Sequence, residues 1–182
     1  MALREVLQFP DPRLKQKAQP LEGVSDEIRR LARDMCDVMY DEPGIGLAAP
    51  QVGEAVRLIV VDTGWSEENA DKNPLILINP EIVEREGKIM WTEGCLSVPD
   101  FQAEVERAAK VTLVARDLDW NEVKITAEEL KAVCFQHEID HLDGILFIDR
   151  ISKLKRSLYV KKRKKALRRE QEEATRASVT RF

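Results

Sequence analysis

The residues most suited to chemistry are two histidines and a glutamate within one short segment. His137, Glu138 and His141 form the pattern H-E-x-x-H, and these two histidines are the only ones in the 182-residue chain. Residues four apart share one face of a helix, so both imidazoles can bind one metal ion. The glutamate beside the first histidine can then act as a general base toward a water molecule. The segment therefore predicts a catalytic metal site.

A third metal ligand must come from elsewhere in the chain, and the extended patterns do not supply it. Where a third histidine would follow, the chain has Phe147, and the first glutamate after His141 is Glu170, within a basic segment. Cys134 lies on the same helical face, but it is about 10.5 Å from His141 along a helix. Metal bonds of about 2.0–2.3 Å cannot bridge that separation, so we expect Cys134 to pack beside the site.

Cys95 is the best remaining candidate for the third ligand. It lies in E-G-C-L-S at 93–97, between predicted strands, where Gly94 permits a close approach of the backbone. Cys36, by contrast, lies near the apolar face of a predicted helix and is expected to pack there. Asp and Glu remain weaker alternatives as ligands. Three protein ligands leave a position open for water, which is typical of catalytic rather than structural sites.

The glycine-rich segment 44–53 is a second candidate for a functional loop. Its spacing invites comparison with dinucleotide-binding loops, which need a strand before the glycines and a helix after them. Here a predicted helix and Pro43 come before the glycines, and Pro50 and Gly53 disfavour a helix after them. The sequence therefore argues against a nucleotide cofactor. It leaves open a simple turn or a backbone that lies against a substrate, with Gln51 as an amide donor.

Three segments together are similar to one protein family. The sequences G-I-G-L-A-A-P-Q at 44–51, E-G-C-L-S at 93–97 and Q-H-E-I-D-H at 136–141 resemble the motifs of peptide deformylases, and the resemblance covers about residues 3–150. It implies an α+β fold in which mostly antiparallel sheets pack around a central metal-binding helix. It also implies an enzyme that hydrolyses the N-terminal formyl group of N-formylmethionyl nascent polypeptides and releases formate.

The same resemblance assigns roles to individual residues. The implied metal ligands are Cys95, His137 and His141. The implied metal is Fe²⁺, with Zn²⁺, Ni²⁺ or Co²⁺ as alternatives. Glu138 would act as the general base and then as the general acid, while Gln51 and the backbone N–H of Leu96 would hold the developing oxyanion.

Three further residues are implied to bind the substrate. Gly46 would lie along the substrate backbone. Ile45 and Val133 would help to line the methionine pocket, together with the ring of His137.

Hydrophobic periodicity predicts the elements that must position these residues. A helix is expected at 26–40 with Ser25 as its N-cap, and strands at 56–62, 75–79, 111–118 and 123–125, with weaker signals near 82 and 89. Residues 64–73 are polar and predict an exposed loop. Thr126 and Glu129 match a capping box, which predicts a second helix from 126 through 141 that stops near Gly144. Together these elements indicate an α+β domain, mostly antiparallel.

Charge divides the chain into an acidic part and a basic part. Residues 1–150 carry 17 basic and 30 acidic side chains, whereas residues 151–182 carry 12 basic and 3 acidic ones. We therefore expect a catalytic domain at 1–150 and a basic helical tail at 151–182. The tail is either a solvated helix or a binder of phosphate backbones, and some deformylases dock on the ribosome through a C-terminal helix.

Aliphatic runs, the first residues and the cysteine count indicate the cellular compartment in which the protein works. The longest aliphatic run has four residues, Leu58–Val61, so no membrane span is expected. The first residues do not resemble a secretory signal, and three cysteines do not suggest a disulfide framework. We therefore expect a cytoplasmic protein.

Two rival functions share parts of this evidence. A metalloprotease that cuts internal peptide bonds would use the same H-E-x-x-H chemistry. A non-catalytic RNA- or ribosome-binding protein would use the basic tail alone. Such a protein would not need the proposed metal ligands, general base and oxyanion donors.

Overall fold

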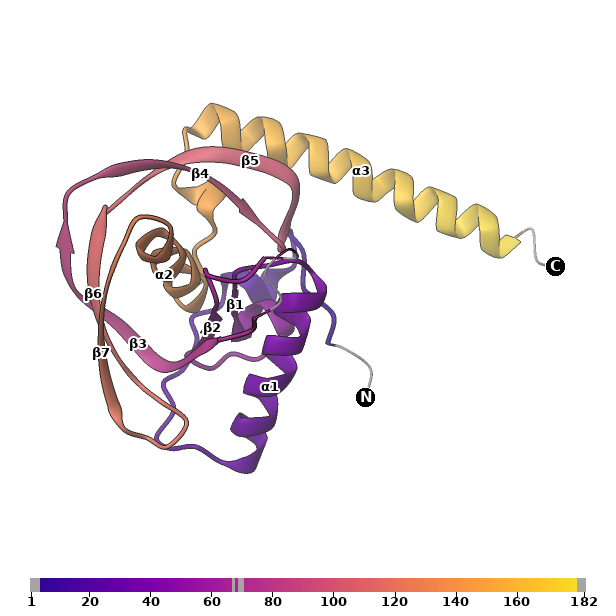
Figure 1. The fold of residues 1–182 in the computed structure, drawn as a ribbon. Helices are drawn as coiled ribbons and strands as arrows, with labels where there is room; N and C mark the ends of the chain where they lie inside the picture. Colours follow the sequence, from indigo (N-terminus) through magenta and orange to yellow (C-terminus); the bar gives the residue numbers. More distant parts are fainter. Residues whose placement is uncertain (1–3, 67, 69–70, 180–182) are drawn as a thin grey trace. The chain divides into compact units, whose positions relative to one another are not determined.

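The chain folds into two compact units. The first ends at Phe147 and the second begins at Ile148. The computed structural model describes residues 4–66, 68 and 71–179 of the chain (Figure 1).

The first unit is built on antiparallel strands. Its larger sheet has the order β1-β2-β3-β6-β7, with the bounds Gly46–Ala48, Leu58–Val61, Leu75–Glu86, Lys110–Arg116 and Glu122–Glu128. The strands β4 (Ile89–Cys95) and β5 (Val98–Arg107) form a separate two-stranded sheet. Each pairing within these two sheets is antiparallel. This confirms the predicted α+β fold class.

Helices of the first unit lie against these strands. Helix α1 spans Asp26–Asp41, and its N-cap Ser25 accepts a hydrogen bond from the Ile28 N–H, as the sequence predicts. Helix α2 spans Glu129–Leu142 and lies within the curve of the strands (Figure 1). Short 3₁₀ turns cover Pro12–Lys15 (η1), Ala49–Val52 (η2) and Phe147–Asp149 (η3).

Strand β2 separates the two apolar clusters of the core. Ile59 and Val61 join the cluster that contains the buried side of α2, whereas Leu58 and Val60 join the cluster of α1. Successive side chains of a strand point to opposite faces, so a strand between two helices must be apolar at every position. This explains the uninterrupted aliphatic run. Cys36 lies in the α1 cluster, which confirms its expected packing role.

The predicted start of the second helix is wrong. Strand β7 continues through Glu128, and α2 begins only at Glu129. Thr126 pairs with Thr112 in the β6–β7 ladder, and their hydroxyl oxygens lie 3.1 Å apart. The tertiary pairing of the sheet therefore overrides a local capping pattern. The helix stops near Gly144 as predicted, with Asp143 as its C-cap.

Strands β3 and β5 also exceed what the sequence indicates. The strand predicted at 75–79 continues past Pro80 to Glu86, with register shifts against β6 where the pairing is interrupted. Strand β5 carries many charged side chains and gives little alternation of apolar residues. Its inward-facing positions include Ala103, Val105 and the charged Arg107, which is buried.

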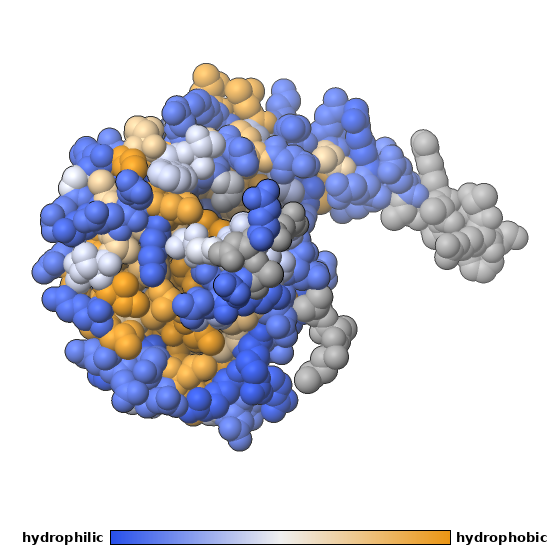
Figure 2. Space-filling view, in the orientation of Figure 1, coloured by the Kyte–Doolittle hydropathy of each residue, from blue (hydrophilic) through white to orange (hydrophobic). Residues whose placement is uncertain are grey.

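The loop after β2 and the second unit complete the described chain. Of the polar stretch 64–73, the described residues form no helix or strand, and residues 67, 69 and 70 lie outside the description. In the second unit, α3 spans Lys153–Val179 and is largely hydrophilic (Figure 2). None of the helices in the described part of the chain has the length and apolar character that a membrane crossing needs.

Gly144 offers a test of how α2 ends. Its φ is 71°, and a Cβ there would lie 2.5 Å from the backbone oxygen of Lys15. We expect Gly144→Ala to lower the free energy of unfolding by about 1–3 kcal/mol, because it combines a left-handed conformation with a backbone clash. Urea unfolding followed by circular dichroism would measure this. Gly23→Ala is the matched control, since a Cβ there meets nothing within 4 Å; equal stability of the two variants would contradict the account.

Candidate metal and active site

Three elements bring the predicted site residues together. Helix α2 supplies His137, Glu138 and His141, all buried. Cys95 ends β4, at the tight turn into β5. Gln51 comes from the 3₁₀ turn η2 that follows β1. Residues far apart in the sequence therefore meet on one face of α2.

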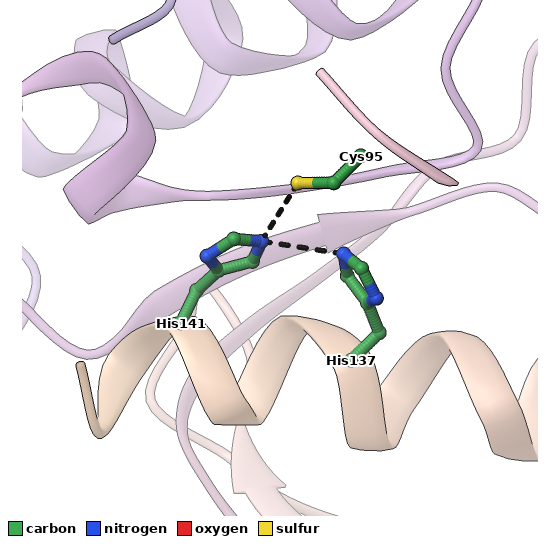
Figure 3. A group of neighbouring side chains, drawn as sticks. All are labelled: Cys95, His137 and His141. Atoms are coloured by element: carbon green, nitrogen blue, oxygen red, sulfur yellow. Dashed lines mark hydrogen bonds between the residues drawn. The ribbon is translucent and has the colours of Figure 1, made fainter. Parts of the chain in front are cut away.

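The three predicted ligands converge on a single point. The Cys95 Sγ lies 3.2 Å from the His141 Nε2, which lies 3.3 Å from the His137 Nε2. Figure 3 shows the sulfur and both rings directed toward one another. Nitrogen and sulfur ligands of a tetrahedral ion lie roughly 3.3–3.6 Å apart, given metal bonds of about 2.0–2.3 Å. Among the described residues these three form a metal-capable group, with ligand atoms within 4.8 Å of one another.

The electrostatics of this group also fit a cation. Burial disfavours the charged form of His137, but hydrogen bonds with Cys95 and Glu93 outweigh it and raise its pKa well above the ordinary value. Positive charge is therefore favoured at this point, and either a proton or a metal ion supplies it. Burial, together with nearby positive charge, holds the pKa of His141 well below its ordinary value. The neutral imidazole that results is the form that binds a metal.

A buried ionic network fixes the orientation of His137. Its Nδ1 lies 2.7 Å from the Glu93 Oε2, which leaves Nε2 to face the other two ligands. Arg107 donates to both oxygens of Glu93, at 2.6 and 2.9 Å, and to Asp140 at 2.6 Å. Burial alone would raise the pKa of Glu93, but the bonds with Arg107 and His137 lower it to about 2. A permanent carboxylate therefore holds the histidine ring.

Sequence reasoning misses this network. Glu93 stands inside one motif and Asp140 inside the H-E-x-x-H segment, but the spacing of neither residue indicates a role. Arg107 has no local signal, because its function depends on two carboxylates that only the fold brings to it.

Glu138 lies beside the ligand group with one oxygen available. Its Oε2 is buried and, among the described residues, has no hydrogen-bond partner; the same holds for the His141 Nδ1. Burial raises the pKa of Glu138 to about 7. A carboxyl group with a pKa near neutrality can both accept and return a proton, which suits a general base that later acts as an acid.

The predicted substrate-binding residues line one pocket. Its volume is about 800 Å³, and its walls include Ile45, Gly46, Val133, Leu96 and Gln51. His137, Glu138 and Cys95 also line it, so the pocket opens onto the candidate metal ligands. A cavity of this size suits a methionine side chain and the adjoining peptide.

Cys134 packs beside the site as predicted, and Phe147 packs there as well. Cys134 is buried, with its Sγ 3.6 Å from the Ile45 carbonyl oxygen. Burial and the charge of Glu138 raise its pKa well above the ordinary value, so it stays a neutral thiol. Phe147 stacks on the ring of His137, with ring centroids 6.1 Å apart. It thus packs against a candidate ligand, at the position where the extended H-E-x-x-H pattern has a third histidine.

This arrangement places the chain among the metallohydrolases. The side chains of Cys95, His137 and His141 surround one point, the buried carboxyl group of Glu138 lies beside it, and a pocket gives access. The chemistry that such a set supports is hydrolysis of a carbonyl compound by an activated water.

Comparison with known proteins identifies the family. The model of the polypeptide deformylase family matches residues 3–157. A peptide deformylase from Rhodopseudomonas palustris (strain BisB5) is 51% identical over 170 residues, which cover 93% of this chain and 97% of that protein. Two crystal structures are also similar. A Legionella pneumophila peptide deformylase has a TM-score of 0.85 and 44% identity, covering 93% of this chain and 98% of that one. An Ehrlichia chaffeensis enzyme in complex with actinonin has a TM-score of 0.83 and 37% identity, covering 91% and 98%.

The chain therefore belongs to the polypeptide deformylase family. It is a metal-dependent hydrolase that removes the N-terminal formyl group from nascent polypeptides. The match confirms the resemblance that the three sequence motifs carry.

Gly46 gives a direct test of the site's packing. A Cβ at this position would lie 2.5 Å from the Glu138 Oε1 and 2.8 Å from the Cys134 Sγ. We expect Gly46→Ala to displace Glu138 and to lower kcat/KM roughly 100-fold, the scale of loss caused by misplacing a catalytic group. Hydrolysis of a formyl-methionyl peptide would measure it. Gly64→Ala is the control, because a Cβ there meets only the Asp62 Oδ1, at 3.8 Å. Wild-type turnover in Gly46→Ala would contradict this packing.

Proposed function

We propose that Cys95, His137 and His141 hold the catalytic metal ion and that Glu138 transfers the protons of formyl-group hydrolysis. The observation that supports this most is the convergence of Cys95 Sγ with the two Nε2 atoms beside a buried carboxyl oxygen that has no partner among the described residues. When bound, the ion would supply a Lewis acid that polarises the formyl carbonyl and lowers the pKa of water.

The residues of the chain supply the remaining steps. The Glu138 carboxylate accepts a proton from the water whose oxygen attacks the formyl carbon. The Gln51 amide and the Leu96 N–H donate hydrogen bonds to the oxyanion that develops as the tetrahedral carbon forms. Glu138 then delivers its proton to the amine nitrogen as the carbon–nitrogen bond breaks. The products are formate and a peptide with a free amino terminus.

The pocket supports methionine as the terminal residue of the substrate. Ile45 and Val133 give it apolar walls close to the ligand group, and Gly46 leaves room for the substrate backbone beside Glu138.

We propose Fe²⁺ as the native metal, as the family resemblance implies. The mixed sulfur and imidazole donors also suit Zn²⁺, Ni²⁺ and Co²⁺. Metal analysis after anaerobic purification would identify the native ion.

We also propose that residues 151–182 form a tail that docks on ribosomal RNA near emerging nascent chains, and that the enzyme works in the cytoplasm. The support is charge: residues 153–169 carry ten basic side chains and no acidic one. Lys161, Lys162, Lys164 and Lys165 are all exposed on α3. Phosphate binding by such a surface is driven by release of counterions and weakens with salt.

Glu138→Gln tests the proton-transfer role. The variant keeps the shape of the side chain but cannot accept the proton, so we expect kcat to fall by about 10²–10⁴. Formate release from formyl-Met-Ala-Ser, measured on enzyme loaded with iron, nickel or zinc, is the readout. Metal content should equal that of the unchanged enzyme, and the unformylated peptide should remain uncut by either. Turnover within a few-fold of the unchanged enzyme would refute the role of Glu138, and cleavage of the unformylated peptide would favour a protease.

Reversing charge in the tail tests the docking proposal. Replacing the four exposed lysines at 161, 162, 164 and 165 with glutamate should weaken cosedimentation with ribosomes at least about tenfold and reduce its dependence on salt. Hydrolysis of the short formyl peptide should not change. Ribosome binding that survives the reversal would reject a phosphate-binding tail.

A further inference from the structure

The side-chain amide of Gln51 is held in one orientation. Its Oε1 accepts a hydrogen bond from the Ala48 N–H at 2.8 Å. A backbone N–H requires an acceptor, so this contact fixes which end of the amide carries oxygen and directs Nε2 the other way. The side chain is only 2% exposed, which leaves little room for other rotamers.

Ser97 receives one of the two hydrogens that Nε2 carries. The Nε2 lies 3.2 Å from the Ser97 Oγ and 3.6 Å from the Cys95 Sγ. Sulfur is a weak acceptor, so the serine oxygen provides the stronger of the two contacts. With one N–H directed to Ser97, the plane of the amide is set. The second N–H lies on the side of Cys95, whose sulfur is only a weak acceptor at 3.6 Å, so it can still donate to an oxygen in the pocket that Gln51 and Cys95 both line.

Ser97 cannot act on a substrate directly. It is fully buried, and it does not line the pocket, although its neighbours Leu96 and Val98 and its partner Gln51 do. The contact of its hydroxyl with Gln51 gives it an indirect route to the reaction.

The N-terminal segment holds the backbones of both residues. The Leu7 N–H donates to the Gln51 carbonyl oxygen at 2.7 Å, and the Phe9 N–H donates to the Ser97 carbonyl oxygen at 2.8 Å. Gln51 follows β1 of the larger sheet, whereas Ser97 lies between β4 and β5 of the separate pair. One short stretch of chain thus ties together the two parts of the fold that carry the amide and its acceptor.

We propose that Ser97 is a positioning residue that holds the Gln51 amide ready to donate to the oxyanion. The proposal rests on the oxyanion role of Gln51 in the proposed function. Removing the Ser97 hydroxyl leaves a buried N–H without its acceptor and frees the amide plane to rotate. The loss should fall on kcat and not on KM, because the donor bond strengthens as negative charge develops.

A double-mutant cycle separates this role from a general effect on packing. Ser97→Ala alone should lower kcat roughly 3- to 10-fold, the scale of one neutral hydrogen bond, with KM and metal content unchanged. Gln51→Ala alone should lower kcat about 10²–10³-fold. In the Gln51→Ala background, Ser97→Ala should cost less than about twofold more, because residues that act through one another are not additive. Full additivity would overturn the proposal.

A second readout does not depend on turnover. The side-chain NH₂ resonances of Gln51, assigned by their loss in Gln51→Ala, should shift or broaden in the Ser97→Ala protein. Thr112→Val is the matched control: it removes a buried hydroxyl that bonds Thr126 in the β6–β7 ladder. It should lower stability but leave kcat and the Gln51 resonances unchanged. Unmoved resonances in Ser97→Ala would reject the positioning role.

The two proposals fail in distinguishable ways. If Gln51→Ala keeps full kcat, the oxyanion role in the proposed function is wrong. If Gln51→Ala loses activity while Ser97→Ala leaves both kcat and the amide resonances untouched, only the role of Ser97 is wrong.

Discussion

The site depends on one buried guanidinium group. Arg107 on β5 binds Glu93 on β4 and Asp140 on α2, and Glu93 in turn holds the ring of His137. Removing one member of such a network leaves an uncompensated charge in the interior, at a typical cost of about 3–5 kcal/mol. The same contacts therefore join the two-stranded pair to the helix and set the position of a candidate metal ligand.

Helix α2 illustrates why this network is necessary. From Ala132 to Leu142 the helix is buried, yet this stretch includes five polar side chains. Buried polar groups are tolerated only when they are paired. Gln136 bonds the backbone of Ala108 and Ala132, and Asp140 bonds Arg107. His137 and Glu138 line the pocket, and His141 faces Cys95, so the remaining polar side chains of this stretch are those of the candidate site.

Gln51, which also lines the pocket, is a buried polar side chain that is likewise paired by hydrogen bonds. Its amide is bonded at both ends, and its backbone is bonded to the N-terminal segment. An amide held in this way needs little reorganisation if it donates to a developing charge, which is the physical basis of preorganised catalysis. Side chains held in place on α2 and on η2 therefore line the same pocket.

The sequence by itself determined the fold class, helix α1 with its cap, the buried strand β2 and the candidate metal ligands. These rest on local spacing, on the chain's having only two histidines, and on the geometric limit that removes Cys134. Only the tertiary structure decided where α2 begins, that β5 is a strand, and which partners Glu93, Arg107 and Ser97 contact. Sheet pairing outweighed the capping pattern at Thr126, and a buried arginine on a strand has no meaning until its carboxylate partners are placed. Each of these features depends on contacts between residues that are distant in the sequence. Such contacts contribute free energy only after the chain has folded and brought the residues together.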